Sequence, residues 1–301
     1  MRVPKKTISA LNGRTIRCFL FDCGDTLWTR NDKVTWHSLE HVANLHTVAV
    51  LRQQVAEQDL PIKDDEELGN EVRKAIEKLL GKVKRQHPGY EPDFTMVTLE
   101  ALIHMGFPKF DKTIGEAVFE ALRVRVPASR PLFPDTLSTL ATLQERGFIL
   151  GVVTNRQWGG QPFVEDLRAI GLLDFFDPNH MAISADLGVR KPNPAIFMHA
   201  LNALRVTPQE TAMVGDSLRA DIAGANQLNI FSIWKPKQRL IAEVKAELPH
   251  NKPYLNNKYL LAYARKQEEK KNKPLPDSVK PNLTIEHLSD LLDVFLKVGK
   301  Q

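Results

Sequence analysis

Cysteine is scarce in this sequence, since 301 residues contain only two, Cys18 and Cys23. Two cysteines cannot build the disulfide framework that stabilises small secreted domains, and this pair does not form a CxxC motif. The scarcity favours a reducing compartment, and we therefore expect a cytoplasmic protein.

Long apolar runs are also missing. No stretch approaches the roughly 18–20 apolar residues of a membrane-spanning helix. Residues 1–17 are basic but lack the apolar core of a signal peptide. We therefore expect neither secretion nor association with a membrane. Because 43% of the residues are hydrophobic and 26% are charged, the composition is that of a folded globular protein and argues against a disordered chain.

The net charge is small, because 41 Lys and Arg residues face 36 Asp and Glu, a balance of +5. This excess is local. Residues 237–273 hold ten Lys and Arg against four Glu, a net +6, with three tyrosines among them. We interpret the segment as a solvated helical insertion, and the alternative is a site for an anionic partner or substrate. Nucleic acid is an unlikely partner, since the chain contains no nucleic-acid-binding motif.

Short apolar runs predict the strands of an α/β domain. From residue 134 onward these runs alternate with helical segments of about ten residues, which is typical of a Rossmann-like parallel sheet with helices on both faces. The expected strands are 15–22, 148–153, 181–184, 211–215, 230–233 and 283–285.

Between the first two expected strands, the apolar residues follow a helical period. They recur every three or four positions, and the expected helices are 34–60, 64–86, 92–105 and 114–126. We therefore predict an all-helical domain inserted after the first strand. The predicted boundaries are an N-terminal extension at 1–14, an α/β core at 15–29 and 128–301 with the basic insertion at about 237–276, and the helical insert at 30–127.

Polar residues follow several expected strands at the point where each strand ends. They are Asp22, Gly24 and Asp25 after the first strand, Thr154 and Asn155 after the second, Lys191 in a later proline-flanked loop, and Asp216 and Asp221 after the fourth. Because the carboxyl ends of parallel strands meet at one edge of a sheet, we expect these groups in one pocket. Clustered carboxylates favour a hard cation such as Mg²⁺, whereas lysine, hydroxyl and backbone N–H groups suit a phosphate.

Four segments resemble, in order, the motifs of the haloacid dehalogenase (HAD) superfamily of hydrolases. They are FLFDCGDTLW (19–28), FILGVVTN (148–155), GVRKPNPAIF (188–197) and MVGDSLRADIAGA (213–225). The resemblance covers about 15–29 and 128–235, and 283–295 fits the family's closing strand and helix. The helical insert occupies the position of the family's cap domain. This resemblance implies a Mg²⁺-dependent phosphohydrolase whose substrate is a small phosphorylated metabolite, a phosphate monoester.

The resemblance also implies catalytic roles. Asp22 would be the nucleophile, which attacks phosphorus and forms an aspartyl-phosphate that water then hydrolyses. Thr154 and Lys191 would hold the phosphoryl oxygens and neutralise the charge that develops in the transition state, and the backbone N–H of Asn155 would add a donor.

A metal site is implied as well. Asp22 and Asp216 would bind Mg²⁺ through their carboxylates, and Gly24 would bind it through its backbone carbonyl. Asp221 would lie next to these ligands without binding the metal, and it would orient Lys191 or a metal-bound water. The resemblance thus implies a single site that holds both the metal and the phosphate.

The sequence departs from the family pattern in the first motif. Family phosphatases usually carry a second Asp two residues after the nucleophile, which protonates the leaving group and then activates water. Here those positions are Gly24 and Asp25, and a glycine cannot transfer a proton. Losing a general acid typically costs about 10²–10⁴-fold in rate. Asp25 is therefore the candidate acid/base, and the alternatives are a water, the substrate or a residue of the helical insert.

Large side chains soon after the nucleophile are candidates for a substrate pocket. Trp28, Trp36 and His37 belong to this group, and the alternative is ordinary packing between the insert and the core. His37 also begins an H-x-x-E-H string of the kind found in some zinc peptidases. We interpret that string as a face of a helix in the insert.

Two further functions remain as alternatives. A non-catalytic or weakly active HAD-fold protein that binds an anionic partner is favoured by Gly24. A dehalogenase-type hydrolase, which cleaves a carbon–halogen bond, is disfavoured by Asp216, because that branch needs no metal. The identity of the substrate and the oligomeric state are not predicted.

Overall fold

The computed structural model describes residues 13–247, 257–272 and 274–296. Most of the expected N-terminal extension at 1–14 therefore lies outside the described residues. The same holds for residues 248–256 and 273 of the expected basic insertion.

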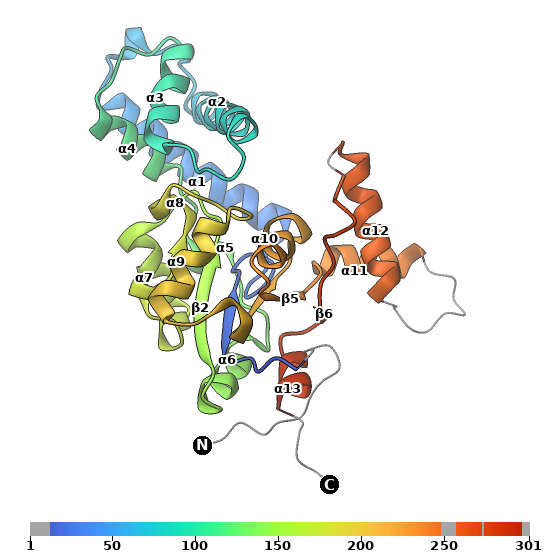
Figure 1. Ribbon diagram of the computed structural model, residues 1–301. Coiled ribbons are helices and arrows are strands. Elements are labelled where there is room, and N and C mark those ends of the chain that lie inside the picture. Colours follow the sequence, from blue (N-terminus) through green and yellow to red (C-terminus); the bar gives the residue numbers. More distant parts are fainter. Residues whose placement is uncertain (1–12, 248–256, 273, 297–301) are drawn as a thin grey trace.

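A six-stranded sheet forms the centre of the larger unit, and all of its strand pairs are parallel in the order β3-β2-β1-β4-β5-β6 (Figure 1). The strands are β1 (Cys18–Phe21), β2 (Ile149–Thr154), β3 (Ala182–Ile183), β4 (Thr211–Gly215), β5 (Phe231–Trp234) and β6 (Leu283–Thr284). The predicted strands and their parallel arrangement are confirmed. The central strand β1 pairs on one side with β2 and on the other with β4, so the ends of three motifs lie next to one another.

Helices cover both faces of this sheet, as the sequence predicts. The side chains of β1 alternate between the faces, because successive residues of a strand point to opposite sides. Phe19 and Phe21 pack in a cluster with α6, α7 and α13, whereas Cys18 and Leu20 pack in a cluster with α9 and α10. The helices of the sheet unit are α5 (Val126–Ser129), α6 (Thr136–Glu145), α7 (Gly160–Ala169), α8 (Ser184–Leu187), α9 (Pro194–Leu204), α10 (Ala223–Gln227) and α13 (Asp290–Phe295).

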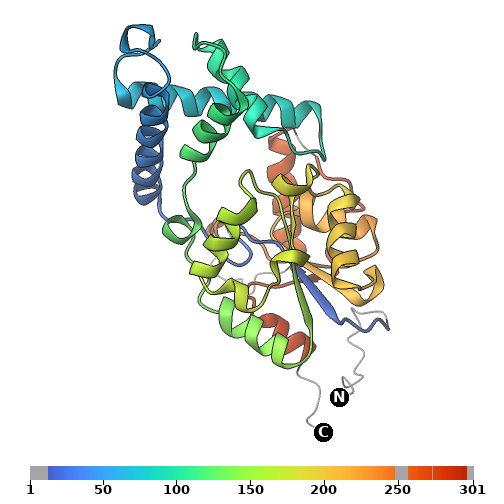
Figure 2. The same cartoon turned by 90° about the vertical axis from the view of Figure 1, so that its left-hand side faces the viewer.

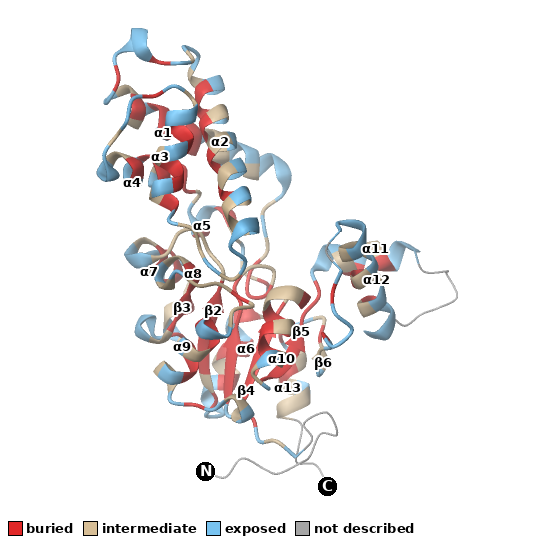
Figure 3. Ribbon diagram, turned by 45° about the horizontal axis from the view of Figure 1, so that its top comes forward, coloured by how far each residue is buried: buried red, intermediate tan, exposed pale blue. Residues whose placement is uncertain are grey.

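Four helices between β1 and β2 form a second unit with a hydrophobic cluster of its own (Figures 1 and 3). They are α1 (Lys33–Arg52), α2 (Asp65–Gln86), α3 (Phe94–His104) and α4 (Lys112–Ala121). Each begins after an aspartate whose carboxylate accepts backbone N–H bonds of the first turn, a favoured helix start; these residues are Asp32, Asp64, Asp93 and Asp111. The unit stands at the end of the sheet unit in both ribbon views (Figures 1 and 2). The domain boundaries at 30 and 127 stay a prediction.

Two of the expected helices are shorter in the structure. The helix expected over 34–60 ends at Arg52, where the chain turns back so that Val55 and Leu60 join the cluster of the helical unit. The helix expected over 114–126 ends at Ala121, and Pro127 then lies in the first turn of the separate α5. In the first case, burial of side chains overrides the helical period. In the second case, Pro127 has no N–H to donate to the preceding turn, so α4 and α5 cannot form one regular helix.

The helical unit touches the sheet unit at a loop as well as through its two connections. The turn at 87–92 and the loop at 188–193 exchange backbone hydrogen bonds. The N–H of Glu91 donates to the carbonyl of Gly188 at 2.9 Å, and the N–H of Arg190 donates to Gly89 at 3.0 Å. This contact involves the residue directly before Lys191, so the helical unit holds the loop that carries the lysine.

The basic segment forms two helices beside the sheet, α11 (Gln238–Glu247) and α12 (Asn257–Lys270). They pack with Trp234 of β5 and with the π-helical turn η6 (Leu218–Ile222) in a cluster of their own. The remaining short turns are η2 (Glu57–Asp59), η3 (Leu172–Asp174), η4 (Pro178–His180) and η5 (Pro208–Glu210). Among the described helices, none is long and apolar enough to cross a bilayer.

Candidate active site

Asp22 directly follows the buried strand β1, and its position is fixed by the sheet. The backbone N–H of Asp22 donates to the carbonyl of Val214 in β4 at 2.9 Å, and only 7% of the residue is exposed. The chain then turns sharply at Asp25, whose φ of 57° is uncommon for a residue other than glycine. This turn carries the chain from β1 toward the helical unit and leaves Asp22 at the carboxyl edge of the sheet.

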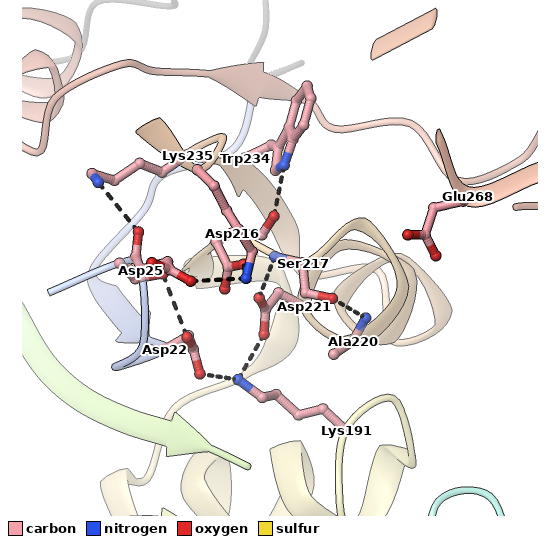
Figure 4. A network of polar contacts seen from close by, with 12 residues as sticks. Asp22, Asp25, Lys191, Asp216, Ser217, Ala220, Asp221, Trp234, Lys235 and Glu268 are labelled. Atoms are coloured by element: carbon pink, nitrogen blue, oxygen red, sulfur yellow. Dashed lines mark hydrogen bonds and ion pairs between the residues drawn. The ribbon is translucent and has the colours of Figure 1, made fainter. Parts of the chain in front are cut away.

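Lys191 lies against Asp22 in the interior of the site (Figure 4). Its Nζ is 2.7 Å from Oδ1 of Asp22 and 2.6 Å from Oδ1 of Asp221, and it donates to the carbonyl of Val153 at 2.6 Å. Burial lowers the pKa of this ammonium, but the two neighbouring carboxylates outweigh that effect, so the pKa is raised above its ordinary value. Lys191 therefore stays charged at neutral pH and faces the candidate nucleophile.

Three carboxylates meet at this edge. Oxygen atoms of Asp22, Asp216 and Asp221 all lie within 4.8 Å of one another. Burial, together with the charges of Asp221 and Asp22, raises the pKa of Asp216 to about 8, although the charge of Lys237 opposes the change. Burial likewise raises the pKa of Asp221 to about 6, although the charge of Lys191 opposes the change. Such crowded oxygens are a donor set that suits a hard divalent cation, which would relieve their repulsion.

The loop after β4 depends on a glycine. Asp221 accepts a hydrogen bond at Oδ2 from the backbone N–H of Ser217 at 2.8 Å. A Cβ placed on Gly215 would lie 2.3 Å from the carboxyl of Asp221, so a larger residue there would displace it. The backbone of the next residue is also held, because the indole N–H of Trp234 donates to the carbonyl of Asp216 at 2.9 Å. The strand end therefore presents Asp216 and Asp221 in a fixed arrangement.

Thr154 and Asn155 end β2 beside these groups. Thr154 is buried. The side chain of Asn155 holds the backbone of Lys191 at two points, because its Nδ2 donates to the lysine carbonyl at 3.0 Å and its Oδ1 accepts from the lysine N–H at 2.8 Å. The sequence singles out the backbone N–H of Asn155, and the structure adds a side chain that positions the lysine.

Two lysines after β5 reach the same edge, and sequence reasoning did not assign them to the site. Lys237 places its Nζ 2.8 Å from Oδ2 of Asp25 and 3.0 Å from Oδ2 of Asp216. Lys235 is buried, lies 3.6 Å from the centre of the Phe133 ring, and donates to the backbone carbonyl of Asp25 at 3.3 Å (Figure 4). Burial lowers the pKa of Lys235 to about 8. The strand-end rule that selects Asp216 would also have found both lysines.

A cavity of about 670 Å³ opens over these groups. Its wall includes Asp22, Gly24, Lys191 and Asp216, and α12 contributes residues such as Glu268, so part of the basic segment borders the site. An anionic partner for the rest of that segment stays a prediction.

The structure places only one of the three candidate pocket residues on the wall of the cavity. Trp28 lines the cavity, whereas Trp36 and His37 are not among its wall residues. Trp36 instead stacks below the guanidinium of Arg130, 4.4 Å from its ring centre. His37 is largely exposed and lies 3.7 Å from Glu40 on the same helix. Within the described residues, the only cluster of potential metal-ligating side chains is the group of three aspartates at the sheet edge, so the H-x-x-E-H string gathers no metal site.

The stability of the metal-free protein is expected to fall as the pH rises from about 5 to 8. The raised pKa of Asp216 means that the native state keeps a proton which the unfolded chain releases above about pH 4. Stability from this group is therefore complete at low pH and is lost as the pH rises toward 8. Thermal unfolding in EDTA measures the effect, and a fall of at least ~2 °C would correspond to roughly 1 kcal/mol in a chain of this size.

The control for this pH profile is Asp216→Asn, which removes the titrating group while keeping its shape. The slope of the unfolding temperature with pH should be flatter in this variant. Adding Mg²⁺ at pH 8 should raise the unfolding temperature of the unchanged protein but not that of the variant. Equal slopes in the two proteins would contradict the assignment to Asp216.

Comparisons with known proteins agree with this geometry. A family model described as haloacid dehalogenase-like hydrolase matches residues 16–229. A glyceraldehyde 3-phosphate phosphatase of Methanopyrus kandleri is 31% identical over 222 residues, which cover 72% of this chain and 83% of the relative. A phosphoserine phosphatase of Thermus thermophilus is 34% identical over 131 residues, 43% of this chain and 48% of the relative. A crystal structure of 2-haloacid dehalogenase from Pseudomonas syringae pv. Tomato aligns with a TM-score of 0.53 at 22% identity over 93% of this chain and 98% of that one, a likeness of fold alone.

Proposed function

We propose that this chain, which belongs to the haloacid dehalogenase-like hydrolase family, hydrolyses small phosphate monoesters. The observation that carries the proposal is the contact of Lys191 with Asp22 at 2.7 Å, beside the carboxylates of Asp216 and Asp221. A carboxylate nucleophile beside a fixed cation and a metal-binding donor set suits phosphoryl transfer through a covalent intermediate. The names of the two phosphatase relatives support a small phosphorylated substrate.

In this proposal, Asp22 carries out the chemical step. Its carboxylate oxygen attacks phosphorus, the bond from phosphorus to the leaving oxygen breaks, and an aspartyl-phosphate forms. A water molecule then attacks the same phosphorus, releases inorganic phosphate and restores Asp22. Lys191 and Thr154, with the backbone N–H of Asn155, bind the phosphoryl oxygens and neutralise their charge in the transition state.

Magnesium is the proposed cofactor. Asp22 and Asp216 would hold it through their carboxylates and Gly24 through its backbone carbonyl, while Asp221 fixes Lys191 from behind. The ion would supply charge neutralisation at the phosphoryl group. Proton transfer to the leaving group is assigned to Asp25, the acidic residue nearest to Asp22 in the same turn. Its Oδ2 accepts a hydrogen bond from Nζ of Lys237 at 2.8 Å.

A non-catalytic or weakly active protein that binds an anion is the second candidate. The observation that favours it is Gly24, because no carboxyl stands at the usual position of the acid/base. A dehalogenase reaction fits the site less well, since that chemistry needs no metal ion and the three aspartates form a donor set for one.

Release of inorganic phosphate from a panel of small phosphate monoesters tests the proposal. The panel includes glyceraldehyde 3-phosphate and phosphoserine, each assayed with Mg²⁺ and with EDTA. We expect turnover that requires Mg²⁺. Absence of turnover from every ester, together with binding of phosphate esters, would favour the non-catalytic candidate. Release of halide from a 2-haloacid without added metal would favour the dehalogenase.

A further inference from the structure

Three arginines on the cavity wall form no ion pair with a carboxylate among the described residues. Arg30, Arg130 and Arg156 all line the cavity that contains Asp22. Within residues 13–247, 257–272 and 274–296, no Asp or Glu oxygen lies within 4.0 Å of their guanidinium nitrogens. Gathering three positive charges without a direct ion pair has an electrostatic cost, which a bound anion would relieve.

Two other arginines, which lie outside the cavity wall, do form ion pairs with a carboxylate. Arg123 and Arg125 both bind the buried Asp166, at 3.0 Å and 2.5 Å, and so fix the start of α5 against α7. That pairing has a structural role, since it neutralises a carboxylate in the interior. The three arginines of the cavity wall form no such ion pair with any carboxylate in the described part of the chain.

Two of the three guanidinium groups, those of Arg130 and Arg156, are held in place, whereas Arg30 is exposed. Arg130 lies over the ring of Trp36 at 4.4 Å and donates to the carbonyl of Ser129 at 3.1 Å. Arg156 lies over the ring of Phe163 at 4.2 Å and 5.7 Å from that of Trp28. A guanidinium has five N–H donors in a fixed plane, so stacking on a ring leaves its edge free to bind an anion with two oxygens.

The three charges act on one another and on the catalytic edge. Burial, together with the charges of Arg30 and Arg156, lowers the pKa of Arg130 to about 10. The charge of Asp25 acts on Arg130 in the opposite sense, and the charges of Asp166 and Asp22 act in that sense on Arg156. The arginines therefore lie close enough to the catalytic edge to meet the substrate that occupies it.

We propose that Arg30, Arg130 and Arg156 form a second anion subsite, so that the preferred phosphate monoester carries another anionic group, either a carboxylate or a second phosphate. This inference rests on the proposed function, because it assigns the scissile phosphate to Lys191 and Thr154. An anion that enters among the arginines gains charge-assisted hydrogen bonds and removes their mutual repulsion. A neutral substituent at that place gains neither.

Matched substrates test the subsite. Glycerol 3-phosphate and 3-phosphoglycerate share a three-carbon skeleton, and only the second carries a carboxylate. Fructose 6-phosphate and fructose 1,6-bisphosphate form the corresponding pair for a second phosphate. We expect kcat/KM to be higher for the doubly anionic member of at least one pair by about 10- to 100-fold, the range expected for one charge-assisted hydrogen bond. The pair that shows the difference identifies the kind of anion.

The variants Arg130→Met, Arg156→Met and the double variant should remove that preference. The ratio of kcat/KM values within the responding pair should fall toward one in the double variant. Arg168→Met is the matched control, since Arg168 is an exposed residue of α7 outside the cavity and its loss changes the net charge equally. An equal fall for both members of a pair would overturn the proposal, because the arginines would then bind the scissile phosphate.

Binding measurements separate failure of the subsite from failure of the proposed function. Calorimetry with the Asp22→Asn variant compares the affinities of 3-phosphoglycerate and glycerol 3-phosphate, and of the two fructose phosphates, without turnover. Tighter binding of a doubly anionic ligand, lost in the variant that also carries Arg130→Met and Arg156→Met, would support the subsite even if no ester is hydrolysed. Equal affinities within both pairs would overturn the subsite and leave the proposed phosphatase activity untouched.

Discussion

Replacing Asp22 with Asn is expected to lower kcat for phosphate-ester hydrolysis by roughly 10⁴- to 10⁶-fold, the loss seen when an enzyme nucleophile is removed. An amide has nearly the same shape as a carboxylate but cannot attack phosphorus at a useful rate. The substitution also removes one negative charge from the proposed metal site. Single-turnover assays with the best ester of the panel measure the chemical step directly.

The Asp22→Asn variant should remain folded. Lys191 keeps its contacts with Asp221 at 2.6 Å and with the carbonyl of Val153 at 2.6 Å, so the buried ammonium is not left unpaired. Asp111→Asn is the matched control, because it makes the same chemical change at an exposed helix start where Asn is also a good cap. A variant that is folded and retains more than about one hundredth of the activity would remove Asp22 from the nucleophile's role.

The fold could be predicted because its signals are local. Each expected strand is a short apolar run, and the alternation with helices fixes a parallel sheet without any knowledge of long-range contacts. The ends of the helices could not be predicted equally well. The period of the helix expected at 34–60 continues past Arg52, but the chain leaves the helix there so that Val55 and Leu60 can be buried. Tertiary packing decided that boundary, and it leaves little trace in a local pattern.

The site was predictable where strand ends supply its residues. Asp22 and Asp216 each follow a strand and Thr154 ends one, so topology alone brings them together. Lys237 belongs to the same group, but its place in the basic segment suggested a solvated lysine. Trp36 follows the nucleophile closely in sequence and still lies off the cavity wall, because α1 carries it into a stack with Arg130. Proximity in sequence is therefore a weaker guide to the site than the position at a strand end.

Replacing Gly24 with Asp is expected to raise kcat by about 10²- to 10⁴-fold, the usual contribution of a positioned general acid. The residue lines the cavity, its φ is not in the left-handed region, and a Cβ placed on it meets no atom within 4 Å. An aspartate therefore fits there without strain, on the same turn as Asp22. The pH dependence of kcat/KM should gain a limb that reports the new carboxyl.

Two companion variants decide whether Gly24→Asp acts through proton transfer. Gly24→Asn has the same size but no acid, so it should not accelerate the reaction. Asp25→Asn should slow the unchanged protein if Asp25 supplies the proton, and should have little effect once an aspartate stands at position 24. The carboxylate of Asp25 is held by Lys237 at 2.8 Å, which favours a slow wild-type reaction and a large gain from the new acid. A Gly24→Asp variant no faster than the unchanged protein would mean that proton transfer does not limit this site.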